Sequence, residues 1–185
     1  MSRSNFYLTM PKERIGALIG KDGNMKKLLE DQAKVALKIN SETGEVYVEA
    51  TNESTAILPV VKNVLRAISC GFSGPSALQL LDEDKHLEIM DLKEIVGKSY
   101  KEMERIKGRV IGRDGKVRKN IENYTNSRIS VYDTTIAIIC KAEDMWIVKR
   151  AIDMIIEGLT HSSVYRFIES NKRKAKEDLS LWERK

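Results

Sequence analysis

The 185-residue chain has few of the side chains that form crosslinks or hold metal ions. Its two cysteines, Cys70 and Cys140, lie far apart, and their spacing favours buried thiols in a reducing compartment over a disulfide framework or a metal-binding motif. Its two histidines, His86 and His161, have no second ligand nearby in the sequence. We therefore expect no metal site and no cofactor.

The chain also lacks a long apolar run and the motifs of common enzyme families. No segment approaches the roughly 20 apolar residues that span a bilayer, and the first residues have no signal-peptide core, so we expect a cytoplasmic protein without a membrane partner. Gly97-Lys98-Ser99 ends like a phosphate-binding loop, but Leu92 stands where the leading glycine belongs. Metalloprotease, dinucleotide-binding and nucleophile-elbow motifs are missing too, so we expect no enzyme and no catalytic residues.

What is present suits a globular protein of one or two domains. Hydrophobic residues make up 42% of the chain and charged residues 32%, enough to bury a core and keep a polar surface. Lys and Arg outnumber Asp and Glu by 32 to 27, which gives a net charge of +5. This excess permits a polyanionic partner but does not require one.

An internal repeat is the strongest signal in the sequence. Residues 16–39 read GALIGKDGNMKKLLEDQAKVALKI, and residues 108–131 read GRVIGRDGKVRKNIENYTNSRISV. Aligned without gaps, the two segments share Gly, Ile, Gly, Asp, Gly, Lys and Glu in the same order. Two copies predict a duplicated module and not a solenoid, which needs at least about three repeats.

Both copies lie within the same predicted order of elements: strand, helix, Gly-x-x-Gly turn, helix, two strands and a helix. For the first copy, periodicity predicts a strand at 6–10, helices at 12–19 and 25–33, a hairpin around 37–48, and a helix at 57–70 that Pro59 delays or bends. For the second copy it predicts a strand at 87–90, a connection at 91–105 that leads to its first helix before the Gly112 turn, and a second helix from 117. Strands at 129–131 and 136–138 and a helix at 147–159 follow. One more helix at 164–177 leads into a basic tail.

The Gly-x-x-Gly turns offer a place for a nucleic-acid backbone. Gly20 and Gly23 in the first copy, and Gly112 and Gly115 in the second, permit a sharp turn and a close approach because glycine has no Cβ atom. The helix after each turn presents free N–H groups and its positive dipole end to phosphates.

The two middle residues of each turn have opposite charges and therefore opposite effects on phosphate binding. Lys21 and Arg113 can contact phosphate directly. Asp22 and Asp114 leave each middle pair neutral, and we expect them to cap the following helix, a contribution of about 1 kcal/mol. RNA affinity must therefore come from the surrounding residues.

The charge around the two turns differs. Residues 12–27 hold five basic and two acidic residues, a balance of +3, and residues 105–119 hold seven basic residues and one acidic, a balance of +6. Since phosphate neutralisation dominates affinity for single strands, we expect the second copy to be the stronger RNA site. The basic candidates are Lys27 in the first copy and Arg109, Lys116 and Lys119 in the second. A solvated helix face is an equal alternative for Lys27 and Lys119, as for Lys26 and Arg118.

Apolar residues beside each turn are candidates for a groove that holds bases. Ile111 and Ile129 would form its floor in the second copy, and Ile19 and Leu37 in the first. Such grooves admit splayed single-stranded bases and exclude a duplex. Gly16 and Gly108 are as consistent with helix packing as with contact to RNA.

The order of elements around IGALIGKDG and KGRVIGRDG resembles the KH domain in its eukaryotic, or type I, arrangement. The resemblance implies an α+β fold of two tandem type I KH domains, each a three-stranded antiparallel sheet covered by three helices. We place the first KH domain at 1–70, a linker at 71–85, the second KH domain at 86–161, and a C-terminal helix with a basic tail at 162–185.

Two further segments narrow the resemblance. GF and ALQLL in residues 71–81 with LEIMDL at 87–92, and GLTHSSVYRFIE at 158–169, are similar to the partner-of-Nob family of small-subunit ribosome assembly factors in its short archaeal form. Membership implies binding of single-stranded rRNA near the 3′ end of the small-subunit RNA. It also implies contact with the 3′-end maturation nuclease and with the alpha subunit of initiation factor two. In this family Gly or Asn often stands where Asp22 and Asp114 stand here.

A different class of function remains open at this point. The KH folds could serve as a scaffold for protein–protein contact with RNA binding incidental, which the neutral turn pairs favour and the +6 segment does not. A cap subunit of an RNA-degradation complex would carry an additional β-barrel, and the sequence has no run of short strands for one.

Overall fold

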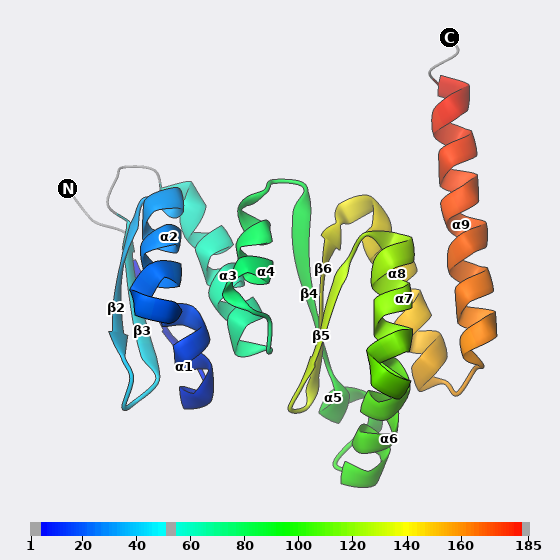
Figure 1. Cartoon of the computed structure of the whole chain (residues 1–185), viewed down its shortest axis with the longest axis horizontal. Helices are drawn as coiled ribbons and strands as arrows, with labels where there is room; N and C mark the ends of the chain where they lie inside the picture. The colour runs from blue at the N-terminus through cyan, green and yellow to red at the C-terminus, as the bar shows by residue number, and fades with distance from the viewer. Residues whose placement is uncertain (1–4, 51–54, 183–185) are drawn as a thin grey trace. The chain divides into compact units, whose positions relative to one another are not determined.

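A computed structural model of the chain describes residues 5–50 and 55–182, with side chains for 5–50 and 56–173. The chain divides into two compact units, Met1–Leu87 and Glu88–Lys185. Both units combine a three-stranded sheet with helices (Figure 1). The predicted α+β class is confirmed.

The first unit follows the predicted order of elements closely. Its elements are β1 (Asn5–Thr9), α1 (Lys12–Ile19), the 3-10 turn η1 (Lys21–Gly23), α2 (Asn24–Ala33), β2 (Val35–Asn40), β3 (Glu45–Ala50), η2 (Thr55–Ile57) and α3 (Leu58–Ser69). Pro59 lies in the first turn of α3, where its missing N–H costs no helical hydrogen bond. The helix therefore begins beside the proline, the first of the two predicted alternatives.

The sheet of the first unit has the order β1-β3-β2, and both pairings are antiparallel, with Leu8 opposite Val46 and Leu37 opposite Val48. Strand alternation turns Val46 and Val48 into the core, where both are fully buried. The opposite face of the sheet carries Tyr7, whose side chain is 75% exposed. Because β3 is central, β1 and β2 are edge strands.

The segment predicted as a linker is mostly structured. It forms α4 (Gly74–Ala77) and the 3-10 turn η3 (Leu78–Leu81), and Ser73 caps α4 by accepting the Ser76 N–H. Phe72, Ala77 and Leu80 are buried. Because these apolar side chains are buried, the segment belongs to the first unit. The bounds 1–70 and 86–161 of the two KH domains stay a prediction.

The second unit repeats the same order with additions. Its elements are β4 (Lys85–Asp91), α5 (Leu92–Val96), α6 (Tyr100–Ile111), η4 (Arg113–Gly115), α7 (Lys116–Thr125), β5 (Arg128–Tyr132), β6 (Thr135–Lys141), α8 (Ala142–Ile156) and α9 (His161–Trp182). The sheet order is β4-β6-β5, and β5 pairs antiparallel with β6, with Ile129 opposite Ile138. As in the first unit, the strand after the turn, here β5, is an edge strand.

The connection predicted at 91–105 is wrong, because it contains α5 and the first half of α6. Asp91 caps α5 by accepting the Lys93 N–H at 2.8 Å, and Ser99 caps α6 by accepting the Glu102 N–H at 3.4 Å. Ser99 and Glu102 have the spacing of a capping box, a signal that was present in the sequence.

Helix α9 is longer than the predicted 164–177. Val164 and Ile168 anchor it because both are fully buried in the core of the second unit, together with Ile152 and Ile155 of α8. Lys172 reaches back to Asp144 of α8 at 2.7 Å. The end of the predicted basic tail, residues 183–185, lies outside the described residues.

Candidate nucleic-acid interface

The two Gly-x-x-Gly turns have nearly the same backbone. Gly20 has φ 73° and ψ 177°, and Gly112 has φ 71° and ψ 175°. Gly23 and Gly115, with φ 74° and 72°, are in the left-handed region. Each turn therefore joins two helices through backbone conformations that favour glycine.

The two glycines of each turn have different roles. A Cβ atom at Gly20 would lie 2.5 Å from the Met25 Cβ, and one at Gly112 would overlap the Val117 side chain. The first glycine is thus required by the following helix. A Cβ at Gly115 would meet only the end of the Lys119 side chain, at 3.9 Å, so this second glycine leaves open surface for a ligand.

The expectation that the aspartates cap the following helices is wrong. Asp22 and Asp114 have a positive φ of 54° inside the 3-10 turns, and the N-cap residues are Gly23 and Gly115, with no side-chain cap hydrogen bond. Asp is one of the few residues other than glycine that tolerate this conformation. The first N–H groups of α2 and α7, those of Asn24 and Lys116, donate to the carbonyl oxygens of Lys21 and Arg113 in the turns, and neither helix has a side-chain cap.

Three of the seven basic residues around the second turn bond to other groups of the same unit. Arg105 pairs with Glu102 at 2.9 Å, and Lys107 pairs with Glu104 and donates to the Asp133 carbonyl. Arg109 donates to the Leu159 carbonyl oxygen. The predicted balance of +6 therefore overstates the charge available to a ligand.

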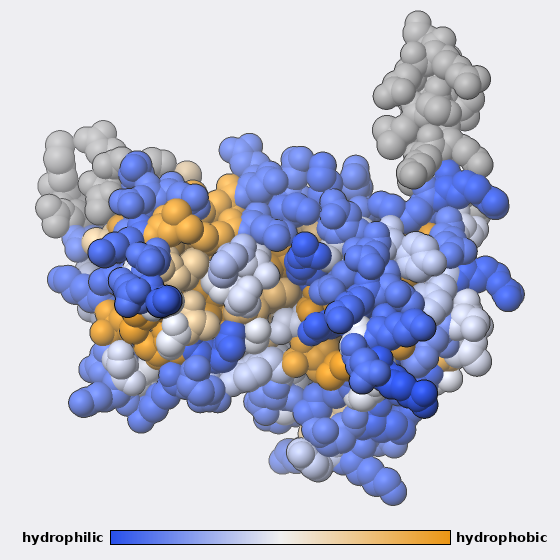
Figure 2. Space-filling model, viewed as in Figure 1, coloured by the Kyte–Doolittle hydropathy of each residue, from blue (hydrophilic) through white to orange (hydrophobic). Residues whose placement is uncertain are grey.

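Four basic residues of the second turn remain. Arg113, Lys116 and Lys119 are exposed and make no ion pair within the described residues, and all three lie on η4 or the start of α7. Arg118 is half-buried, and its Nε has no hydrogen-bond partner among the described atoms. The surface over α7 is hydrophilic in Figure 2.

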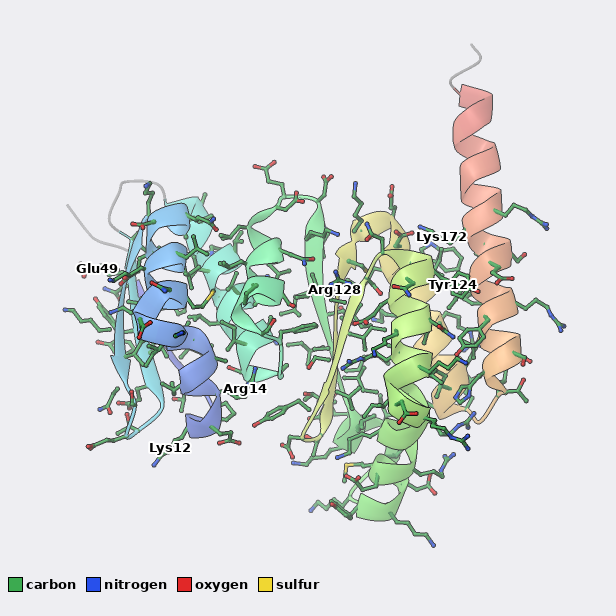
Figure 3. All side chains as sticks on the ribbon, in the orientation of Figure 1. Lys12, Arg14, Glu49, Tyr124, Arg128 and Lys172 are labelled. Atoms are coloured by element: carbon green, nitrogen blue, oxygen red, sulfur yellow. The ribbon has the colours of Figure 1, made fainter. Side chains whose placement is uncertain are left out.

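The first turn has less free charge. Arg14, labelled in Figure 3, donates to the carbonyl oxygens of Ile68 at 2.9 Å and Phe72 at 2.5 Å, so it ties α1 to the end of α3. Lys26 pairs with Glu30 at 3.8 Å. Lys21 and Lys27 are exposed on the turn and on α2. Asn24 stands where the second turn has Lys116.

The proposed groove floor differs in detail from the prediction. Ile111 and Ile19 are half-buried at the ends of α6 and α1, so part of each side chain is available. Ile129 and Leu37 are each only 3% exposed, and their side chains belong to the core. On this side β5 and β2 therefore offer their edge backbone and not these side chains.

That edge backbone has an unexpected partner in both units. The Leu37 N–H donates to Glu30 Oε1 and the Ile129 N–H donates to Glu122 Oε1, each at 2.7 Å. Sequence reasoning assigned neither glutamate a role, although the shared Glu of the repeat was the signal for it. Both carboxylates lie on the helix after the turn and reach the edge of the sheet.

Gly16 and Gly108 occupy equivalent positions in α1 and α6, four residues before the first turn glycine. A Cβ atom at either would have no heavy atom within 4 Å. Within the described residues, packing against another element does not explain them.

Helix α9 is connected to the turn region. The His161 ring lies 3.1 Å from the Arg109 carbonyl oxygen, next to the Arg109–Leu159 bond. Tyr124 of α7 lies 6.1 Å, ring to ring, from Tyr165 of α9. A hydrogen bond with Glu169 and the charge of that carboxylate raise the pKa of Tyr124 above its ordinary value of 10.0.

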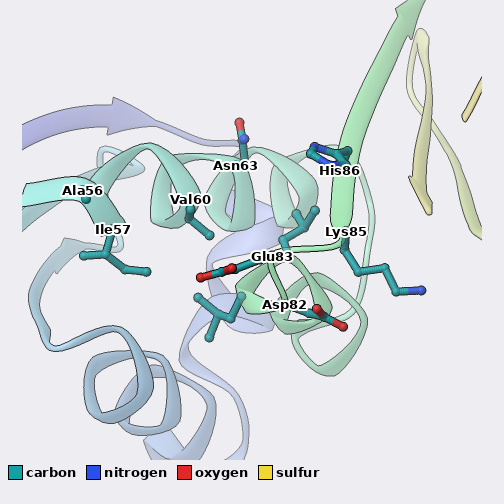
Figure 4. A pocket seen from close by; sticks show the side chains of 10 residues that line it. Ala56, Ile57, Val60, Asn63, Asp82, Glu83, Lys85 and His86 are labelled. Atoms are coloured by element: carbon teal, nitrogen blue, oxygen red, sulfur yellow. The ribbon is translucent and has the colours of Figure 1, made fainter. Parts of the chain in front are cut away.

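A pocket of the first unit lies away from the turn. It has a volume of about 360 Å³ in the first unit, between the start of α3 and the segment from η3 to β4, with Val60, Leu81, Glu83 and His86 in its lining (Figure 4). The described residues hold no group of three or more His, Cys, Asp or Glu side chains that could bind a metal ion. Among them, no helix is long and apolar enough to cross a membrane.

Comparison with known proteins identifies the family. Residues 86–173 match the family model for the second KH domain of PNO1, described as a eukaryotic-type KH domain (KH-domain type I). A KH domain-containing protein of Methanocaldococcus jannaschii is 38% identical over 181 residues, which cover 96% of this chain and 79% of that protein. A chain in the crystal structure of an a/eIF2alpha–aDim2p–rRNA complex from Pyrococcus horikoshii is also 38% identical, with a TM-score of 0.85 and coverage of 93% and 96%. The chain belongs to the archaeal PNO1/Dim2 family.

Eukaryotic members of the PNO1/Dim2 family are longer. The pre-rRNA-processing protein PNO1 of Phaeosphaeria nodorum is 27% identical over 133 residues, which cover 71% of this chain and 51% of that protein. The chain thus spans about half the length of this relative. The PNO1/Dim2 family is the one that the motifs at 71–92 and 158–169 resembled.

Proposed function

We propose that the chain is a ribosome assembly factor built from two tandem type I KH domains, and that it holds single-stranded small-subunit rRNA near its 3′ end. The PNO1/Dim2 relatives, one named for pre-rRNA processing and one crystallised with rRNA, support the RNA partner. The observation that carries the proposal is a group of exposed basic side chains, Arg113, Lys116 and Lys119, which make no ion pair within the described residues and lie at the N-terminus of α7, where no side chain caps the helix.

In this proposal binding is physical and no catalytic residue is involved. The sugar–phosphate backbone crosses the turn at Gly115, where no Cβ intervenes, and phosphates meet the α7 N-terminus. Bases lie between Ile111 and the edge of β5. The second turn is the stronger site because Arg113, Lys116 and Arg118 stand where the first has Lys21, Asn24 and the paired Lys26.

The proposed partners beyond RNA are proteins of the same assembly. The Pyrococcus complex contains a/eIF2alpha, so the alpha subunit of initiation factor two is a proposed partner of this chain. The 3′-end maturation nuclease is proposed from the family resemblance alone. The proposed localisation of such a factor is cytoplasmic.

Fluorescence anisotropy tests this proposal with a single-stranded RNA that copies the 3′ end of small-subunit rRNA, competed by scrambled RNA and by duplex. We expect the native single strand to bind more tightly than scrambled RNA or duplex. Its affinity should fall as the salt concentration rises, because binding releases cations from the RNA. The charge reversal Arg113→Glu with Lys116→Glu should weaken binding about tenfold or more, since two phosphate contacts are lost.

The matched control is Lys21→Glu with Lys27→Glu in the first unit, which should weaken binding only about two- to threefold on the same electrostatic grounds. All four residues are exposed, so unfolding midpoints should not move. Equal and weak binding of all RNAs, or equal losses in the two double variants, would contradict the proposed site.

A specific observation favours protein contact as a second role for the first unit. On the open face of its sheet, the Tyr7 and Tyr47 rings lie 4.7 Å apart, and Lys38 Nζ lies 5.6 Å from the Tyr47 ring. Exposed aromatic groups of this kind are typical of protein interfaces. If the alpha subunit binds there, Tyr7→Ala should lower its affinity in calorimetry and leave RNA binding unchanged; loss of RNA binding alone would contradict this role.

A further inference from the structure

The carboxylate that holds the edge of the second sheet lies where a base would be read. Glu122 is on α7, seven residues after Gly115, and its Oε1 accepts the Ile129 N–H at 2.7 Å. The N–H groups of β5 that face away from β6 point out of the sheet, because β5 is an edge strand. A base lying between Ile111 and this edge would therefore contact the Glu122 carboxylate before it contacted the backbone of β5.

The carboxylate has capacity left for a ligand. A carboxylate offers about four lone-pair positions on two oxygens, and the Ile129 N–H uses one of them. Glu122 is half-buried, and within the described residues it makes no ion pair. A half-buried, unneutralised carboxylate accepts hydrogen bonds strongly and repels carbonyl oxygens.

The first unit provides an internal comparison. Glu30 makes the same 2.7 Å bond to the Leu37 N–H, but Lys26, one helical turn earlier, lies 3.8 Å from the same oxygen. In the second unit the residue at that position is Arg118, whose buried Nε has no hydrogen-bond partner among the described atoms. The geometry of the bond is thus duplicated, but the negative charge is neutralised only in the first unit.

We propose that Glu122 sets the base preference of the second turn and selects bases with an exocyclic amino group over uracil. This rests on the proposed RNA binding. The free oxygen of Glu122 accepts the cytosine N4 or adenine N6 amino group, and the carbonyl oxygens of uracil face the same negative charge. Phosphates are placed by the turn and by the basic residues, and the identity of one base is read by the glutamate.

The test compares oligocytidylate with oligouridylate of equal length at neutral pH, since the two pyrimidines have the same size. We expect the protein to bind oligocytidylate about tenfold more tightly, the range of one hydrogen bond to a charged group. Glu122→Gln keeps an oxygen for the Ile129 N–H and replaces the other oxygen by an amino group. It should reduce the ratio to about threefold or less, or invert it.

Glu30→Gln is the matched control and should leave the wild-type ratio unchanged. A wild-type protein that binds both oligonucleotides equally, or a Glu122→Gln variant that keeps the full ratio, overturns the role of Glu122 while RNA binding itself stands. A wild-type protein that binds neither oligonucleotide overturns the proposed function as well. Because the wild-type ratio is measured first, the inference does not depend on the folding of the variant.

Discussion

The two turns of this chain share their backbone and differ in what surrounds it. The φ and ψ angles of Gly20 and Gly112 agree within a few degrees, and Asp22 and Asp114 have the same unusual positive φ. Yet Lys26 is paired with Glu30, and Arg118 at the equivalent position is not paired with Glu122. The duplicated module therefore fixes a shape, and the difference in binding depends on a few side chains on the helix after the turn.

The second unit also has a helix with no counterpart in the first. Helix α9 contacts α7 and α8, and the Arg109–Leu159 and His161–Arg109 bonds join the start of α9 to the end of α6 beside the turn. The first turn is instead supported by Arg14, which bonds carbonyl oxygens at and after the end of α3. Each turn is thus braced through an arginine on the helix before it, at a different position.

The largest effect is expected for the first glycine of the second turn. Gly112→Ala forces an L side chain to φ 71° and overlaps Val117, so it should lower the free energy of unfolding by about 3 kcal/mol. Gly115→Ala meets no such overlap and should cost about 1 kcal/mol from backbone strain alone. Denaturant unfolding measures both, and equal losses would show that the two glycines do not differ in role.

A smaller effect is expected from the ion pair that holds α9, which has no counterpart in the first unit. Asp144 is only 7% exposed and lies 2.7 Å from Lys172 Nζ. Lys172→Met keeps the aliphatic stem but leaves the carboxylate unpaired, and should cost about 1–2 kcal/mol in unfolding free energy. Double substitution with Asp144→Asn should recover part of this loss, and an unchanged midpoint in the single variant would contradict the expectation.

Substitution of the helical glycines Gly16 and Gly108 should raise the free energy of unfolding, in contrast to the two predictions above. Gly16→Ala and Gly108→Ala add a Cβ in open space, so each should stabilise the protein by about 1 kcal/mol. Only Gly108→Ala should also weaken RNA binding, by a few-fold, because it fills the surface beside the stronger site. Thermal unfolding and anisotropy on the same two variants measure both effects. Stabilisation without any loss of binding would place the RNA away from this face of α6.

The smallest effect is expected for the titration of Tyr124. Gln32 stands at the equivalent position of the first unit. The hydrogen bond with Glu169 raises the pKa of Tyr124 above 10.0, because it favours the neutral phenol. Any stability from this contact is complete below pH 10 and is lost as the pH rises through the raised value. The tyrosinate absorbance of the wild-type protein minus that of Tyr124→Phe should give a midpoint above 10.0, and Glu169→Gln should lower it.

Local patterns predicted most of the fold. Alternation found the strands that flank the turns, and the range 12–19 predicted for the first helix is that of α1. The start of α6 was missed because its first turn is polar and exposed on most sides, so apolar periodicity begins only at Met103. The cap at Ser99 was the better guide to that boundary.

The site was predicted less completely, for a physical reason. The sequence locates the turn residues, but the charge available at the turn depends on bonds to distant residues, such as Arg109 to Leu159 and Lys107 to Asp133. The aspartate caps failed because a positive φ takes the side chain out of capping geometry. Both outcomes depend on three-dimensional contacts that local composition does not contain.

The bond between each repeated glutamate and its strand has a consequence for the solution behaviour of the protein. β2 and β5 are edge strands, and unpaired edges invite pairing with a strand of another molecule. Glu30 and Glu122 occupy one outward N–H of each edge with a charged group, which blocks that position for an incoming strand. The same two residues therefore help to keep two open sheets in one chain from polymerising edge to edge.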